Sequence, residues 1–149
     1  MGNLVQRVFS QYINNFENLK FDFELNDVDR KIIDEANVCF EKTSELIEKV
    51  ELKSSLQSVM GYVNKINAYL NETEPWKVIK EDITRATAIL YTSLTAIEAC
   101  ASLFTPFMPT TSEIVKNAIE KNTNNNWSVN DIKKGAPLQD IGHLFKKFD

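Results

Sequence analysis

Glycine, proline, histidine and cysteine are all scarce in this sequence of 149 residues, and each shortage excludes a class of protein or site. Glycine and proline number four each, which is too few for the frequent turns of a β-sandwich. The one histidine, His143, and the two cysteines lack the close spacing of zinc ligands. Because Cys39 and Cys100 both lie in apolar patterns, we expect two buried free thiols rather than a disulfide.

Motifs of catalysis and of membrane insertion are also missing. The glycines are isolated, so there is no glycine-rich phosphate loop, and neither a Gly-x-Ser-x-Gly nor a His-Glu-x-x-His motif occurs. The longest apolar stretches are interrupted by lysine, glutamate, threonine or serine, and no signal peptide is recognisable. We therefore expect neither a complete enzyme nor a membrane protein, and the default location is the cytoplasm.

The composition suits one soluble domain and limits the nucleic-acid binding that it can support. Hydrophobic residues make up 43% of the chain and charged residues 26%, as in a globular protein with a packed core. The formal net charge is −4 and the isoelectric point is about 5.1. Charge-driven binding along a nucleic acid needs a basic surface, so only recognition of a few nucleotides by a small local site is compatible with this balance.

Apolar residues recur every three or four positions along most of the chain, which predicts amphipathic helices. We expect the second helix to be capped by Asn26 or Asp27 and the last one by Thr110 or Thr111. The expected fold is all-α: an antiparallel bundle of about five helices with the apolar C-terminal tail packed back on it. The helices are expected over residues 2–15, 27–50, 52–70, 82–104 and 110–119.

A proline and a tryptophan stand together between two of these helical patterns. Pro75 suits the first turn of a helix, and it should bias Glu74 toward an extended backbone. Trp76 is then held at a helix–helix corner with its ring orientation restricted. A fixed ring with amides and cations nearby can stack an unpaired base, although a tryptophan at a corner often only covers a bundle core. The neighbouring side chains are Asn67, Tyr69, Lys77 and Lys80.

Four motifs follow one another along the chain: GNLVQRVF at 2–9, NAY at 67–69 followed by PWKVIK at 75–80, LFTPFMP at 103–109 and GHLFKKFD at 142–149. In this order they resemble the anticodon-binding domain of methionyl-tRNA synthetases. The last motif departs from the family pattern, since LFKKF stands where Pro-Arg-Ile is usual. The resemblance covers nearly the whole length and identifies residues 1–149 as a single anticodon-binding helical domain. The uncapped Met1-Gly2 start further suggests a piece of a longer chain that continues upstream.

The resemblance implies a function and a set of residues. Domains of this family recognise the CAU anticodon of methionine tRNAs, so the expected partner is methionine tRNA. Matched by motif, the anticodon-binding residues are Asn3 and Arg7 on the first helix, and Trp76 supported by Pro75 at the corner. The catalytic domain of the methionine–tRNA ligase, with its ATP, Mg and usual zinc, would lie upstream and contact this domain. No catalytic residue, cofactor or metal is expected in residues 1–149, which should be a monomer.

Plainer roles remain open for each of these side chains. Arg7 could pair with a carboxylate on a solvated face, and Asn3 could only cap a helix. Asn67 is more simply a buried amide that ties helix ends together, and Tyr69 is more simply part of the corner packing. Three cations could contact phosphates or only be solvated: Lys77, Lys80 and Arg85.

Two other functions also remain open. A helical protein-interaction module could dock through the Trp76 corner or the Phe-rich tail, and the net acidity slightly favours it. A carboxylate-bridged metal enzyme would need inward Glu-x-x-His pairs, which are missing. The acidic residues of the second helix are more simply its solvated face: Glu35, Glu41, Glu45 and Glu48.

Overall fold

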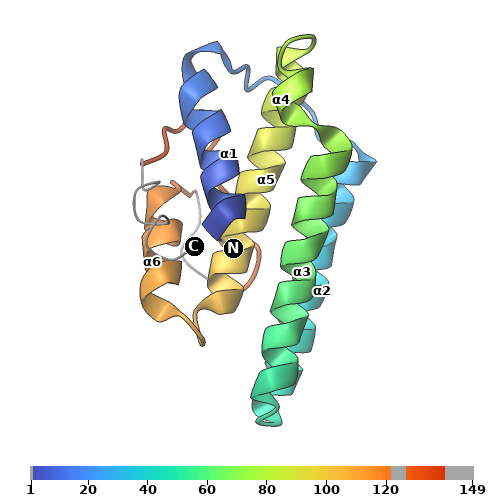
Figure 1. The fold of residues 1–149 in the computed structure, drawn as a ribbon, viewed down its shortest axis with the longest axis vertical. Coiled ribbons are helices and arrows are strands. Elements are labelled where there is room, and N and C mark those ends of the chain that lie inside the picture. The colour runs from blue at the N-terminus through green and yellow to red at the C-terminus, as the bar shows by residue number, and fades with distance from the viewer. Residues whose placement is uncertain (1, 122–126, 140–149) are drawn as a thin grey trace.

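The computed structural model describes residues 2–121 and 127–139, and these residues form a helical bundle without β-strands (Figure 1). The expected all-α bundle is thereby confirmed. Five helices of the described chain have ten residues or more, and a one-turn helix and a 3-10 turn join them. The elements are α1 (Gly2–Asn15), η1 (Phe16–Asn18), α2 (Asp27–Glu48), α3 (Leu52–Thr73), α4 (Pro75–Val78), α5 (Ile83–Phe104) and α6 (Pro109–Ala118).

Helix α5 forms the centre of the bundle, and α1, α2, α3, α4 and α6 all pack against it. Every residue from Ala86 to Phe104 is buried. Four of its buried hydroxyls donate to carbonyls one turn earlier, as Thr92 does to Ala88 at 2.8 Å, and the Ser102 hydroxyl donates to the Glu98 carboxylate at 3.3 Å, so their burial leaves none of these donors unpaired. By length and composition α5 could also span a membrane, but its most apolar stretch is fully buried in the protein. It is therefore the core helix of the bundle.

The helix ends agree with the predicted caps at α2 but not at α6. Asn26 forms a capping box with Asp29, which confirms the first of the two expected α2 caps. Helix α6 instead begins at Pro109, with Met108 at the N-cap position and no side-chain cap. Thr110 and Thr111 therefore lie inside this helix. A proline at the first position already removes one unpaired N–H and fixes a helical φ, which makes a hydroxyl cap dispensable.

The corner before the tryptophan differs from the expectation. Helix α3 continues to Thr73, and Glu74 has a left-handed backbone (φ 47°, ψ 61°) instead of the extended one expected before a proline. The Glu74 N–H donates to the Leu70 carbonyl at 2.9 Å and closes α3. Its own carbonyl accepts from the N–H groups of Lys77 and Val78 and starts α4. Two helix ends thus meet at one residue, at a conformational cost of roughly 1–2 kcal/mol for a non-glycine residue.

The segment 127–139 returns across the bundle. The Tyr12 hydroxyl donates to the Ala136 carbonyl at 2.7 Å, and the Trp127 indole N–H donates to Ser44 at 2.6 Å. The Asn130 amide donates to the buried Glu98 carboxylate at 3.0 Å. The expected contacts of the tail beyond Gln139, with His143, lie outside the described residues.

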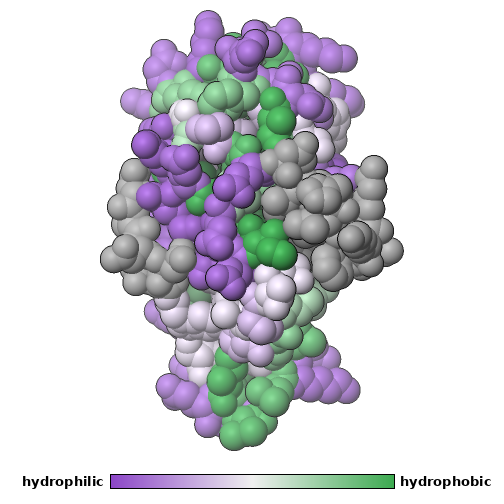
Figure 2. All heavy atoms as spheres, turned by 90° about the vertical axis from the view of Figure 1, so that its left-hand side faces the viewer, coloured by the Kyte–Doolittle hydropathy of each residue, from purple (hydrophilic) through white to green (hydrophobic). Residues whose placement is uncertain are grey.

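Two features of the surface and core complete the fold. Both cysteines, Cys39 and Cys100, are free and buried, as expected. Figure 2 shows an apolar patch at the free end of the α2–α3 hairpin, at the bottom of the view. In this turn Val50 is 76% exposed and Leu52 is 56% exposed.

Candidate nucleic-acid interface

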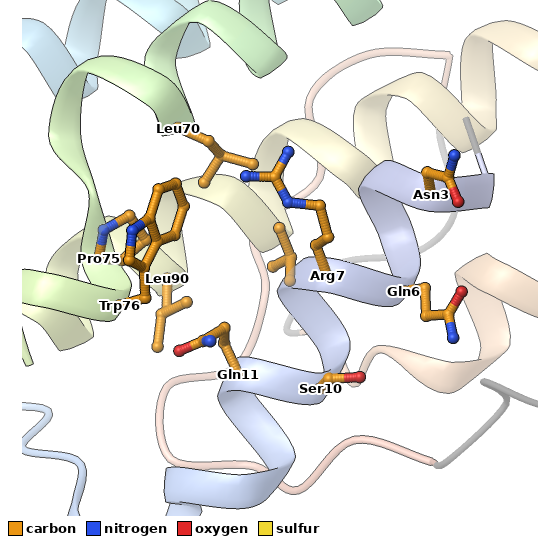
Figure 3. A pocket seen from close by; sticks show the side chains of 10 residues that line it. Asn3, Gln6, Arg7, Ser10, Gln11, Leu70, Pro75, Trp76 and Leu90 are labelled. Atoms are coloured by element: carbon orange, nitrogen blue, oxygen red, sulfur yellow. The ribbon is translucent and has the colours of Figure 1, made fainter.

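A cavity of about 610 Å³ lies between α1 and the corner that joins α3 to α4 (Figure 3). All four residues predicted to bind the anticodon line it, although Asn3 and Trp76 are 73 positions apart in the chain. The cavity combines an aromatic ring and aliphatic side chains with polar side chains, which is typical of a small-ligand or base-binding pocket. Its lining comprises Asn3, Gln6, Arg7, Val8, Ser10, Gln11, Leu70, Pro75, Trp76 and Leu90.

The position of Trp76 follows from the corner geometry. Glu74 turns the chain, and Pro75 occupies the first position of α4 with its ring buried. The Ile79 N–H donates to the Pro75 carbonyl at 3.0 Å, so the single turn of α4 is closed. Helix α4 packs on α5, and the Trp76 ring is half-buried against the core with its other side toward α1. The ring is therefore held in place while part of its surface stays open to the cavity.

Arg7 faces this ring from α1. Its guanidinium carbon lies 5.2 Å from the centre of the Trp76 ring, within the range of a cation–π contact. No carboxylate of the described residues pairs with Arg7, so the alternative of a surface ion pair is not observed. Asn3, one turn earlier, lies within α1, and its exposed side chain makes no hydrogen bond to the described part of the chain.

Three further polar residues of α1 line the same cavity, although no sequence motif predicted them. They are Gln6, Ser10 and Gln11. Their spacing of three and four residues from Asn3 and Arg7 was the available signal, since such positions share a helix face. Figure 3 shows Gln11 on the Trp76 side of α1, whereas Gln6 and Ser10 point to the other side.

A buried ionic cluster holds the helices behind the corner. Asp29 of α2 is fully buried and accepts two hydrogen bonds from the Arg85 guanidinium, at 2.6 and 2.9 Å, and one from the Tyr69 hydroxyl. Burial by itself would raise the pKa of Asp29, but the hydrogen bonds from Arg85, Tyr69 and the Asn26 backbone together hold it below its usual value. Tyr69 thus has the structural role that was expected. Arg85 is an internal ion-pair partner and not a free cation for a phosphate.

The other polar residues near the corner make fewer contacts with the described part of the protein. Lys77 pairs with Glu74 at 2.8 Å on the surface, and Lys80 is exposed without a partner among the described residues. Asn67 is half-buried, and its side chain makes no hydrogen bond within the described ranges, so the expected tie between helix ends is not seen.

The acidic face of α2 offers no metal site in the part of the chain that the structure describes. No three histidine, cysteine, aspartate or glutamate side chains of that part group closely enough to hold a metal ion. Glu41, Glu45 and Glu48 are exposed, and Glu35 lies 4.0 Å from Lys65. These carboxylates therefore form a solvated face.

Comparison with known proteins connects this geometry to a family. The model of a family described as the anticodon binding domain of methionyl tRNA ligase matches residues 22–149. A methionine–tRNA ligase from a Roseiflexus species is 37% identical over 112 residues, which cover 75% of this chain and 19% of that protein. The methionine–tRNA ligase of Pyrococcus furiosus is 31% identical, with 99% of this chain and 20% of that protein covered. The chain therefore spans about a fifth of the length of these relatives.

Among solved structures, a methionyl-tRNA synthetase also contains a domain with this fold. The apo form of Mycobacterium tuberculosis methionyl-tRNA synthetase superimposes with a TM-score of 0.71 at 21% identity, over 78% of this chain and 24% of that one. Since the family model matches most of the chain, including Pro75 and Trp76, the assignment rests on sequence as well as on fold. The chain belongs to the family of anticodon-binding domains of methionyl-tRNA ligases.

Proposed function

We propose that this domain belongs to a methionine–tRNA ligase and binds the CAU anticodon of methionine tRNA in the cavity between α1 and the Trp76 corner. The observation that carries the proposal is the convergence of Asn3, Arg7 and Trp76 on one cavity. The remaining four fifths of such a ligase would supply the catalytic domain, with ATP and its metal ions. That domain and the tRNA are the partners that we expect.

Stacking on Trp76 would contribute to the binding free energy whichever base is bound. Anticodon loops present unpaired bases, and stacking one base on an aromatic side chain contributes about 1–3 kcal/mol. In the unbound protein Arg7 covers part of this ring. An exposed cation–π contact contributes only about 0.5–1 kcal/mol, so exchanging the guanidinium for a base is favourable. Arg7 is then free to move to the edge of the stacked base.

Discrimination would come from that edge. Cytosine presents acceptors at O2 and N3, and the guanidinium of Arg7 has only donors, so the two match. Uracil presents an N–H at position 3, which would face donor with donor and leave a buried group unpaired at a cost of about 1–3 kcal/mol. Asn3 lines the same cavity and would contact the same nucleotide.

Binding of two anticodon stem-loops tests this function. The 149-residue chain is titrated with CAU and UAU stem-loops at low and moderate salt, and Trp fluorescence is followed. Tighter binding of CAU, with a fluorescence change that Trp76→Phe abolishes and Trp127→Phe retains, is the expected result. Equal affinity for both stem-loops would contradict the proposal. No measurable binding of either would favour the alternative, a helical protein-interaction module.

A further inference from the structure

We propose that Gln11 recognises an adenine adjacent to the base stacked on Trp76, so that the cavity holds two consecutive nucleotides. The inference rests on the proposed function and extends it to a residue with no assigned role. Two observations support it: the size of the cavity, and an amide in its wall that has no hydrogen-bond partner among the residues that the structure describes.

The cavity is larger than one base requires. Pockets of about 300–1,000 Å³ accommodate drug-sized ligands, and this one measures about 610 Å³. A cytosine base has only eight non-hydrogen atoms by its chemical formula, so it would leave much of this volume open. The neighbouring nucleotide of the same loop is the group that must lie closest to the remaining space.

Gln11 is the polar residue best placed to meet that nucleotide. It lies one helical turn after Arg7, on the Trp76 side of α1 (Figure 3). One turn advances about 5.4 Å along the helix axis, and successive nucleotides of a stacked strand are about 3.4 Å apart. Side chains on consecutive turns can therefore address consecutive bases.

The Gln11 amide is available for a ligand. The residue is half-buried, and its side chain makes no hydrogen bond to any residue that the structure describes. Its backbone carbonyl accepts a hydrogen bond from the Asn15 side-chain amide at 2.8 Å, which leaves the side-chain amide itself unaffected. Burying this amide under a nucleotide without a partner would be unfavourable, so the adjacent base has to offer both a donor and an acceptor.

Adenine offers that combination. A glutamine amide pairs in a bidentate manner with the N6 amino donor and the N7 acceptor of adenine. Guanine presents two acceptors, O6 and N7, on the same edge, and one of them would face the amide oxygen. An amide that faces this edge of the base therefore prefers adenine to guanine, in agreement with the middle letter of CAU.

A comparison of base and side-chain changes tests the inference. The 149-residue chain and its Gln11→Ala variant are titrated with CAU, CGU and UAU stem-loops and with a CAU stem-loop whose adenine is replaced by purine, which lacks only the N6 amino group. Asn14→Ala is the control, because Asn14 is exposed on the same helix and does not line the cavity. We expect the wild-type chain and the control to favour CAU over CGU by about 5- to 150-fold.

The Gln11→Ala variant should lose most of that preference and become insensitive to the removal of the N6 amino group. Its preference for CAU over UAU should persist, since that preference depends on Arg7. An unchanged CAU/CGU ratio in Gln11→Ala, or no such preference in the wild-type chain, would overturn the role of Gln11. If the wild-type chain showed no preference for CAU over UAU, the proposed recognition of the first base would be wrong instead. The two failures are therefore distinguishable.

Discussion

Trp76 and Arg7 contribute differently to the proposed site, because a ring face contacts every base alike whereas a guanidinium carries only donors. The ring is fixed by a buried proline before it and by the packing of α4 on α5. The arginine is exposed and has no carboxylate partner among the described residues, so its contact with the ring is free to exchange. Binding strength should thus depend on Trp76, and base preference on Arg7.

Replacing Trp76 tests whether binding strength depends on its ring. Trp76→Ala should weaken binding of the CAU stem-loop by about 5- to 150-fold, which corresponds to the loss of one stacked base. Trp76→Phe should retain part of the affinity, because a smaller ring remains. Binding is measured by fluorescence anisotropy of labelled RNA, with Trp127→Phe as a control, since Trp127 contacts Ser44 and Phe40 away from the cavity. Wild-type affinity in Trp76→Ala would show that the ring is not a stacking surface.

At the scale of helices, the corner depends on the cluster that joins α2, α3 and α5. Asp29, Tyr69 and Arg85 come from these three helices in that order. The carboxylate is completely buried and the guanidinium is partly exposed, with 26% of its side-chain surface accessible. Removing one partner of a buried pair costs about 3–5 kcal/mol, because the other charge is left uncompensated. The cluster is therefore a point where acid should destabilise the fold.

Asp29→Asn should lower the free energy of unfolding at pH 7 by about 3–5 kcal/mol. The pKa of Asp29 is lowered in the folded state, so its stabilising contribution is complete above the unfolded value of about 3.9 and is lost as the pH falls through the folded value. The wild-type chain should therefore lose more stability than Asp29→Asn between pH 5 and strongly acidic pH. Urea unfolding across this range measures both effects.

Asp34→Asn is the matched control for this experiment. Asp34 lies on the same helix, is exposed and has no ion pair with a described residue, so its replacement should change stability little. Equal acid sensitivity of the wild-type chain and Asp29→Asn would contradict the role given to the cluster.

On the scale of the whole molecule, the segment 127–139 is held to the core through another buried carboxylate. Glu98 of α5 accepts hydrogen bonds from the Asn130 amide at 3.0 and 3.2 Å and from the Ser102 hydroxyl at 3.3 Å. Burial raises the pKa of Glu98, although Asn130 and the nearby Lys121 act in the opposite direction. The protonated form is therefore favoured in the folded state relative to the unfolded chain.

The sign of this shift predicts a second pH dependence, opposite to that of Asp29. Because the folded pKa of Glu98 lies above the unfolded value of about 4.3, its contribution makes the fold less stable as the pH rises from that value through the folded one. Glu98→Gln should reduce this loss. The free energy of unfolding of the variant should therefore increase relative to that of the wild type as the pH rises from 4 to 8. The control is Glu113→Gln, exposed on α6. Parallel stability profiles would exclude the effect.

The sequence predicted the parts of the molecule that depend on local pattern. The helices, the Asn26 cap and the placing of Asn3, Arg7 and Trp76 on one site followed from periodicity and from the family motifs. The left-handed Glu74 was missed because the residue serves two helix ends at once, and no local rule encodes this. The pairing of Arg85 with Asp29, 56 positions away, and the presence of Gln11 in the cavity depend on how distant elements pack. Periodicity assigns a side chain to a face but does not identify its partner.

Anticodon recognition by this domain is tested most directly by the ratio of the dissociation constants for CAU and UAU stem-loops, measured for the wild-type chain and for Arg7→Ala. Arg7 is exposed, so its removal should leave the fold intact, which circular dichroism would verify. We expect the wild-type chain to favour CAU by about 5- to 150-fold, and Arg7→Ala to bring the ratio close to one, mainly by weakening the CAU complex. Equal weakening of both complexes by Arg7→Ala, with the ratio unchanged, would contradict this expectation.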